Sequence, residues 1–151
     1  MTAALLLPAA LLLGCGGEDG GGQKAESSPK ATMAAYFDAL ADADYALACK
    51  QLTDEYRAGT IEEWNSLMDE KTTTCEETLA ASVDMVKAFS DAEDGKALWR
   101  YEGLNAVVDG DSAMATVQLT AFQDEDSTYF LQKVDGAWLV SGDDDGSESA
   151  E

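Results

Sequence analysis

The sequence predicts an α+β fold, with helices in the first half of the chain and a four-stranded antiparallel sheet in the second. Apolar residues recur at helical spacing from about residue 29 to about residue 90. After about residue 95 the spacing changes to alternation, and Asp-Gly pairs at 109–110 and 135–136 divide this half into hairpins. Helices followed by consecutive strands indicate a domain in which the helices pack on the sheet.

Two helices are predicted between residues 28 and 52. Ser28 is a suitable N-cap, and Pro29 fits the first turn that follows it. The apolar side of this first helix consists of Met33, Tyr36, Phe37 and Leu40. Asp44 can cap a second helix, on which Cys49 belongs to the apolar face. We therefore expect Cys49 to face the core.

Two further helix starts have the Ser/Thr-x-x-Glu form of a capping box. The first, at 60–63, is expected to open a short third helix, and the second, at 74–77, a longer fourth one. The predicted apolar stripe of the third helix is Ile61, Trp64, Leu67 and Met68. The stripe of the fourth is Leu79, Val83, Val86 and Phe89. Cys75 lies in the first turn of the fourth helix.

Four strands are predicted after the polar break at 91–95. Their expected ranges are Ala97–Val108, Ala113–Ala121, Tyr129–Val134 and Ala137–Ser141. The second strand has the clearest alternation, because Ala and Val or Leu occupy every other position from residue 113 to 121. An Asp-Gly pair is a strong hairpin signal, since both residues tolerate the positive φ angles of a tight turn. The strands therefore form a meander.

The charge of the chain excludes one class of partner. The formal net charge is −21, from 30 acidic and nine basic residues, and there is no histidine. Such a surface repels phosphate backbones, so we expect no nucleic-acid partner. Without histidine, and without a Gly-x-Ser-x-Gly or phosphate-binding glycine motif, the sequence has no hydrolase or nucleotide-binding signature and predicts no cofactor.

The first 14 residues are predicted to be a lipoprotein signal peptide. Ala3–Leu13 is an uncharged apolar run of 11 residues, where a membrane-spanning helix needs about 20. Leu12-Leu13-Gly14-Cys15 has the form of a lipobox. We therefore expect lipidation of Cys15, which would anchor the protein to the extracytoplasmic face of the cell membrane. Met1-Thr2 departs from the usual pattern, because no basic residue precedes the apolar run.

The remainder of the chain divides into three regions. Residues 15–30 contain the lipidated cysteine and a linker rich in Gly and Ser, and residues 31–143 form the folded domain. Residues 144–151 are predicted to be an acidic disordered tail. The segment 141–147 partly imitates a calcium loop, but it begins with Ser and lacks the closing Glu, so we expect no metal site there.

Cys49 and Cys75 are predicted to form a disulfide bond. Export would place both thiols in an oxidising compartment, and lipidation of Cys15 leaves one pair. A redox dithiol would require closer spacing, and a zinc site would lack histidine ligands. The bond requires the second and fourth helices to be in contact.

The order of these motifs resembles the nuclear transport factor 2-like superfamily, particularly small actinobacterial lipoproteins without an assigned function. The resemblance is carried by YFDALADADYALACKQL, VDGDSAMATV and KVDGAWLV, within residues 30–143. It implies a cone in which the first helix and a concave sheet enclose a pocket. Some members are ketosteroid isomerases or polyketide cyclases, and many others are binding or assembly modules.

Tyr36 is the one catalytic candidate that this resemblance implies, because isomerases of the superfamily keep an oxyanion-binding tyrosine on the first helix. Such a role also needs a nearby carboxylate base. The favoured hypothesis is a non-enzymatic domain that binds a small apolar ligand in the cone or an envelope protein on its sheet. The alternative is an isomerase or lyase acting on a small apolar substrate. A carboxylate within reach of Tyr36 would favour the enzyme, and a filled pocket would favour the binding domain.

Overall fold

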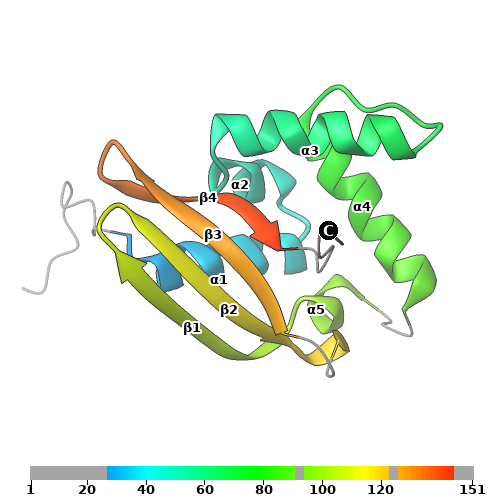
Figure 1. Ribbon diagram of the computed structural model, residues 1–151. Coiled ribbons are helices and arrows are strands. Elements are labelled where there is room, and N and C mark those ends of the chain that lie inside the picture. The colour runs from blue at the N-terminus through cyan, green and yellow to red at the C-terminus, as the bar shows by residue number, and fades with distance from the viewer. Residues whose placement is uncertain (1–26, 91–93, 123–125, 145–151) are drawn as a thin grey trace, which may run out of the picture.

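The computed structural model describes residues 27–90, 94–122 and 126–144. It shows helices followed by a four-stranded antiparallel sheet, which confirms the α+β fold class (Figure 1). The helices are α1 (Pro29–Ala41), α2 (Tyr45–Lys50), α3 (Asp54–Leu67), α4 (Cys75–Phe89) and α5 (Gly95–Leu98). The strands are β1 (Tyr101–Asp109), β2 (Ser112–Leu119), β3 (Asp126–Val134) and β4 (Ala137–Asp144), with a short 3₁₀ helix at Thr120–Phe122.

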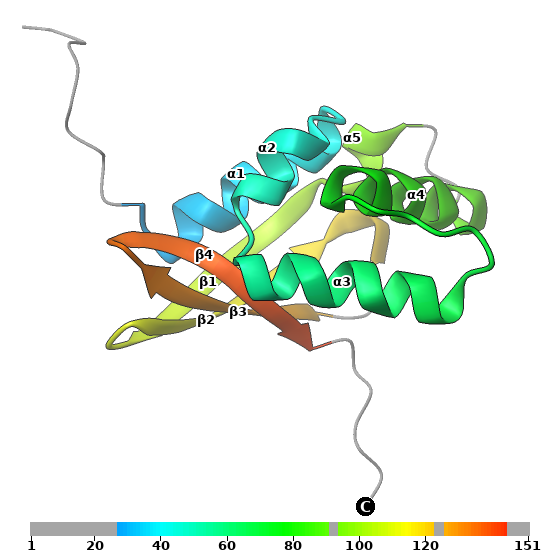
Figure 2. The ribbon, with the colours of Figure 1, turned by 90° about the horizontal axis from the view of Figure 1, so that it is seen from above.

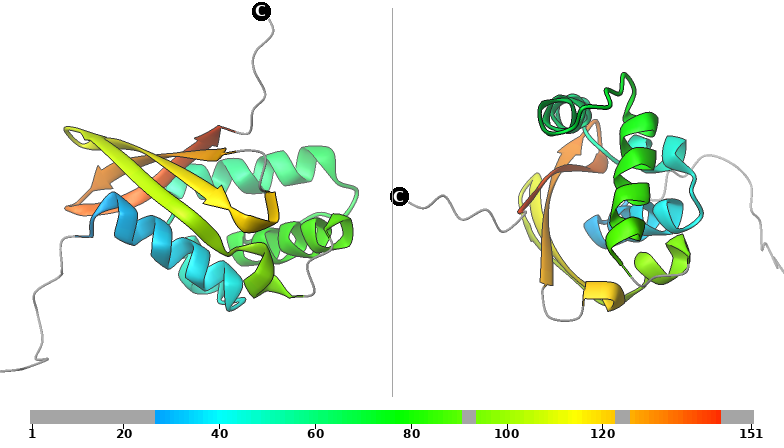
Figure 3. Two further views of the ribbon diagram at one scale, coloured as in Figure 1. Left: turned by 90° about the horizontal axis from the view of Figure 1, so that it is seen from below. Right: turned by 90° about the vertical axis from the view of Figure 1, so that its right-hand side faces the viewer.

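The sheet is a curved meander in the order β1-β2-β3-β4, as predicted. Its turns use the residues that the sequence indicated: Gly110 and Gly136 have φ angles of +62° and +83°, and Asp135 has a φ of +49°. Within the described ranges, the helices lie on the concave side of the sheet and none covers its convex side (Figures 2 and 3). Helix α1 contacts β1, β2 and β4 from the concave side.

Burial alternates along β2 because its two faces have different surroundings. Ala113, Ala115, Val117 and Leu119 are buried under the helices. Met114 and Gln118, between them, are exposed on the convex side. This pattern confirms the predicted period of two. The core formed on the concave side is dominated by Phe37, Met33, Leu52 and Leu131, which are all at most 2% exposed.

The disulfide bond between Cys49 and Cys75 joins α2 to the start of α4, which confirms the predicted pair. Both cysteines are buried in the core. The predicted capping box at the start of α4 is also present, because Thr74 and Glu77 satisfy each other's backbone N–H groups. The covalent bond and the cap together fix the position of α4 relative to α2.

Helix α3 corrects the predicted start of the third helix. It begins at Asp54 with Thr53 as its N-cap, so the Thr60 that was expected to cap it lies in the helix interior. There the Thr60 hydroxyl donates to the Tyr56 carbonyl instead of capping a helix end. None of the residues of α3 is fully buried, and Leu67 of its expected apolar stripe is 72% exposed. The helix therefore packs at the margin of the domain.

The strand ends also differ from the prediction. Ala97 lies in α5, and Ala121 lies in the 3₁₀ helix, so neither belongs to a strand. Strand β4 continues past Ser141 to Asp144, which places the first residue of the predicted tail in the sheet.

The folded domain begins before the predicted boundary at residue 31. Ser27, which was assigned to the linker, accepts a hydrogen bond from the Trp138 backbone N–H at 3.0 Å. Ser28 caps α1, and Thr32 donates to the Trp138 carbonyl at 2.9 Å. These contacts attach the first turn of α1 to β4. None of the helices in the described ranges combines the length and the hydrophobicity needed to cross a bilayer.

Candidate functional site

Tyr36 lies on α1 and points into the concave side of the sheet, where only 9% of its surface is exposed. Its ring contacts Phe37, with ring centroids 5.5 Å apart, and Tyr129 of β3, at 6.4 Å. The side chain is therefore part of the core. The sequence left two roles open for Tyr36, a core residue or an oxyanion donor.

Three tyrosines and one carboxylate gather where α1, α3 and the β3–β4 hairpin meet. We call Tyr36, Tyr56, Tyr129 and Asp143 the tyrosine cluster. The Tyr56 hydroxyl donates a hydrogen bond to Asp143 Oδ1 at 2.5 Å. Asp143 lies opposite Tyr129 in the β3–β4 ladder, so the two side chains share the concave face. The cluster thus brings a carboxylate close to Tyr36, which sequence reasoning missed.

The electrostatics of the cluster keep its tyrosines protonated. Burial raises the pKa of Tyr36, Tyr56 and Tyr129 above their ordinary value, and the negative charge of Asp143 raises each pKa further. All three hydroxyls can therefore donate hydrogen bonds at neutral pH, but none is tuned to accept a proton there. Asp143 is exposed to water and already holds the Tyr56 hydroxyl.

Aromatic rings fill the concave side beside this cluster. The Phe37 side chain is fully buried, and its ring centroid lies 5.6 Å from Tyr129, 5.8 Å from Tyr101 and 6.2 Å from Trp99. Edge and tilted contacts of this kind are the packing of a core. A substrate that reached Tyr36 from this side would have to displace these rings.

The convex face of the sheet exposes a row of large apolar side chains. Val107, Met114 and Phe130 are direct neighbours across β1, β2 and β3, and they are 67%, 45% and 43% exposed. We call them the convex patch. The positions beside them on β2 and β3 are uncharged: Ser112, Thr116, Thr128 and Gln132. On β1, the exposed Asp109 follows Val107 on the same face, at the end of the strand. Large exposed apolar patches rimmed by polar residues are typical of interaction sites.

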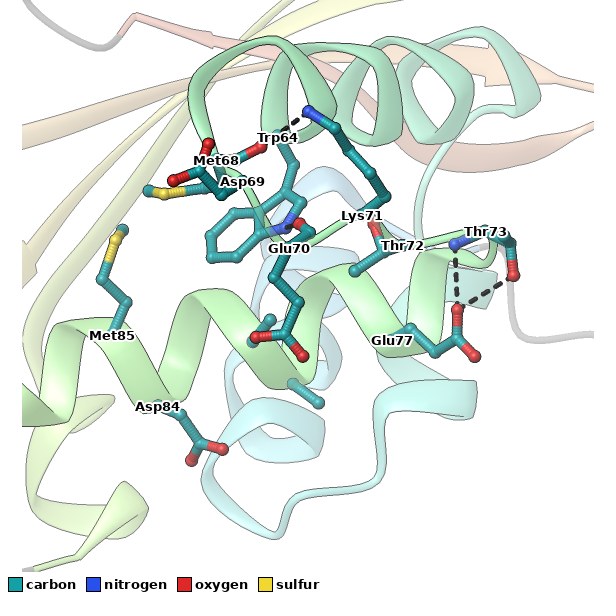
Figure 4. Close-up of a pocket in the computed structure, with 12 residues that line it drawn as sticks. Trp64, Met68, Asp69, Glu70, Lys71, Thr72, Thr73, Glu77, Asp84 and Met85 are labelled. Atoms are coloured by element: carbon teal, nitrogen blue, oxygen red, sulfur yellow. Dashed lines mark hydrogen bonds between the residues drawn. The ribbon is translucent and has the colours of Figure 1, made fainter.

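A second feature is a cleft of about 780 Å³ between the end of α3, the loop that follows it, and one side of α4 (Figure 4). Trp64 and two methionines, Met68 and Met85, contribute apolar surface to it. Acidic residues also line it.

The other predicted site residues are the three cysteines and the calcium-like segment. Cys15 is outside the described residues, so its lipidation stays a prediction. Cys49 and Cys75 are bonded to each other and are therefore structural. In the part of the calcium-like segment that is described, Asp143 belongs to β4 and binds Tyr56. Across residues 27–90, 94–122 and 126–144, no three Cys, Asp or Glu side chains are grouped closely enough to hold a metal ion.

Comparison with known proteins gives one structural similarity. No protein-family model and no curated protein matches the chain significantly. Among solved structures, it is similar to an NTF-2 like protein of unknown function from Shewanella oneidensis MR-1. The two are 16% identical, with a TM-score of 0.41, over 74% of this chain and 90% of that protein. The architecture described above agrees with the α+β fold of the nuclear transport factor 2-like superfamily that the sequence resemblance implied.

Proposed function

We propose that this protein is a lipid-anchored, extracytoplasmic lipoprotein whose domain binds an envelope protein through the convex face of its sheet and catalyses no reaction. The observation that carries this proposal is the convex patch, in which Val107, Met114 and Phe130 form an exposed apolar row across three strands. The partner presents an uncharged apolar surface to this row.

Charge supports this choice of surface. The chain has a net charge of −21, so most approaches to it would bring carboxylates into an interface and strip them of water. Around Met114 and Phe130 the neighbouring side chains on the convex face are Ser, Thr and Gln. The carboxylates of this face, Asp109, Asp126 and Asp144, lie at the ends of their strands. A partner that covers the three apolar side chains can therefore leave these carboxylates at the wet rim, around the dry centre that specific interfaces have.

The concave side supports a binding role without catalysis. Phe37 and its neighbouring rings fill the concave side of the sheet. This is the side on which the superfamily resemblance implies a pocket. General acid-base chemistry near neutral pH needs a group that titrates there. The chain has no histidine, and burial moves the pKa values of Tyr36 and Tyr129 away from neutrality.

Replacing Met114 with Glu tests the interaction surface. We expect the M114E variant to bind its partner at least about 100-fold more weakly, because the new carboxylate would be buried without a counter-charge. Gln118→Glu is the matched control, since Gln118 is exposed on the same face of the same strand and the charge change is equal.

The measurement is co-purification from detergent-solubilised envelopes of the native organism, with each bound protein quantified by mass spectrometry. Wild type and Q118E should retain the same protein, and M114E should lose it. A partner retained equally by all three proteins would show that the convex patch is not the docking surface.

The lipid anchor has its own test. Export and lipidation are inferred from Leu12-Leu13-Gly14-Cys15, and replacing Cys15 with Ser removes the thiol that would carry the lipid. Wild type should enter the detergent phase on temperature-induced phase separation, and C15S should stay in the aqueous phase. Equal partitioning of the two proteins would contradict the anchor.

The second candidate function is an isomerase or lyase of the ketosteroid isomerase or polyketide cyclase type. One observation favours it: Asp143 lies close enough to Tyr36 to raise its pKa. A protonated tyrosine beside a carboxylate is the pair such an enzyme needs, as oxyanion donor and base.

The Tyr36→Phe variant distinguishes the two functions, because it removes the hydroxyl and little volume. If the domain only binds, wild type and Y36F should both fail to turn over small enones or polyketide-like substrates. Measurable turnover by wild type that falls at least about 100-fold in Y36F, as expected when an oxyanion donor is lost, would establish the enzyme instead.

A further inference from the structure

The apolar surface of the cleft between α3 and α4 centres on the ring of Trp64, which a hydrogen bond holds in place. The Trp64 indole Nε1–H donates to the Glu70 carbonyl at 3.1 Å, which orients the ring. Met68 follows α3 on the same side of the cleft as this ring, and Met85 projects from α4 toward Met68 (Figure 4). Thioethers and an indole form an adaptable apolar surface, which suits side chains of varied shape.

One face of α4 forms the wall opposite Trp64. Glu77, Ala80, Ala81, Asp84 and Met85 line the cleft, and their spacing of i, i+3, i+4, i+7 and i+8 places them on one side of the helix. The two alanines leave room in the middle of this wall. Eight residues of helix span about 12 Å, which is the length of about four residues of an extended peptide. The cleft is therefore an elongated trough.

The charge in the trough is negative. Its lining includes the acidic residues Asp69, Glu70, Glu77 and Asp84, of which Asp84 forms an ion pair with Lys87 at 3.8 Å. Hydrogen bonds from Thr73 lower the pKa of Glu77, so this carboxylate stays ionised. Within the described part of the chain, neither Asp69 nor Glu70 has an ion-pair partner.

Lys71, the one cationic residue of the lining, binds backbone carbonyls at the end of α3. Its ammonium group donates to the carbonyls of Asn65 and Met68, at the end of α3 (Figure 4 draws the bond to Met68). There it stabilises the carbonyl end of the helix, which carries a partial negative charge. Its charge is therefore directed to these carbonyls, and within the described ranges it forms no ion pair with a carboxylate of the trough.

We propose that this trough binds a basic peptide segment of another protein. An apolar side chain of the segment packs against Trp64 and the methionines, and its Lys or Arg residues pair with the carboxylates of Asp69 and Glu70. A metal ion alone does not fit, because in the described ranges these carboxylates are not gathered into a set of ligands. The length of the trough fits a peptide better than a single amine. This site is separate from the convex patch, so the two proposals can fail independently.

The probe is the synthetic peptide acetyl-Lys-Lys-Leu-Phe-Lys-Lys-amide, measured by isothermal titration calorimetry at physiological salt against the full-length lipoprotein in detergent. A peptide with Gly-Ser in place of Leu-Phe should bind at least about 10-fold more weakly, because it lacks the apolar contact. Hexylamine should also bind at least about 10-fold more weakly than the Leu-Phe peptide. Equal binding of either comparison compound would overturn the proposal.

Two variants test the location of the peptide. Ala81→Leu fills the trough without a change of charge, and it should weaken binding at least about 10-fold. Asp69→Asn with Glu70→Gln removes two carboxylates and should weaken binding to a similar extent. Its matched control is Glu62→Gln with Glu63→Gln, two exposed carboxylates on α3 that do not line the trough.

The control pair should leave the affinity unchanged within about twofold. If both double variants weakened binding equally, the attraction would be a diffuse effect of the acidic surface and the proposal would be wrong. Unchanged binding in A81L would also overturn it. Circular dichroism would show whether A81L is folded, and if it is not, the comparison of the two double variants decides.

Discussion

Removing the disulfide bond with Cys49→Ala and Cys75→Ala is expected to lower the free energy of unfolding by about 3.5 kcal/mol. The bond closes a loop with a sequence separation of 26 residues, and in the chain-entropy treatment this loop restricts the unfolded chain. The bond also fixes α2 against α4, and both cysteines are buried. A loss of this size is a large part of the stability of a small domain.

Urea denaturation of the domain, followed by circular dichroism, measures this change. The C49A/C75A variant and wild type treated with reductant should give the same lowered midpoint, since both lack the bond. The oxidised wild type, with and without alkylating agent, is the control, because bonded cysteines do not react. A loss of less than about 1 kcal/mol would show that the bond does not hold the fold together.

Replacing Phe37 with Ala is expected to cost about 3–5 kcal/mol of stability. Phe37 is fully buried at the centre of the concave side, and its ring contacts Tyr36, Trp99, Tyr101 and Tyr129. The neighbouring rings are themselves packed against other elements, so they cannot collapse fully into the space that the substitution leaves.

Phe130→Ala is the matched control for this substitution. It removes the same atoms from the convex face, where Phe130 is 43% exposed, so we expect it to cost less than about half as much. Chemical denaturation of F37A and F130A under the same conditions makes the comparison. Equal losses would contradict the filled concave core on which the non-catalytic function rests.

The sequence predicted the features of the fold that depend on local chemistry. Ser28 caps α1, Thr74 and Glu77 form the capping box of α4, and Gly110 and Gly136 make the hairpin turns. Each of these residues acts on neighbours within a few positions, so its role can be recognised without the tertiary structure. The alternation along β2 was equally clear, because one face of that strand is buried throughout.

The start of α3 was harder to predict from the sequence, because two possible N-cap residues lie close together. Thr53 and Thr60 can both cap a helix, and Glu63 completes the capping-box pattern for the second. What favours Thr53 is a tertiary contact: its backbone N–H donates to the Val140 carbonyl of β4 at 2.8 Å. Val140 lies 87 positions further along the chain, so the residues around Thr53 carry no local sign of this contact.

The tyrosine cluster was missed because of strand register. A regular hairpin from the turn at 135–136 would pair Tyr129 with Gly142. A register shift between Phe130 and Leu131 pairs Tyr129 with Asp143 instead. From the sequence, the fourth strand is expected to end at Ser141, and Asp143 falls in the calcium-like segment. An irregularity of one residue moves a side chain to the other face of a sheet, and no pattern in the sequence marks this one.

The most direct test of the account is site-specific photo-cross-linking from the convex patch in intact cells. A photoreactive benzoylphenylalanine at position 107, which is 67% exposed, should form a covalent product with one other envelope protein. Adding Met114→Glu to the same chain should abolish the product, and adding Gln118→Glu should not. No product from position 107, a product with the mass of two copies of this chain, or a product that M114E leaves unchanged would contradict the proposed docking of an envelope protein on this face.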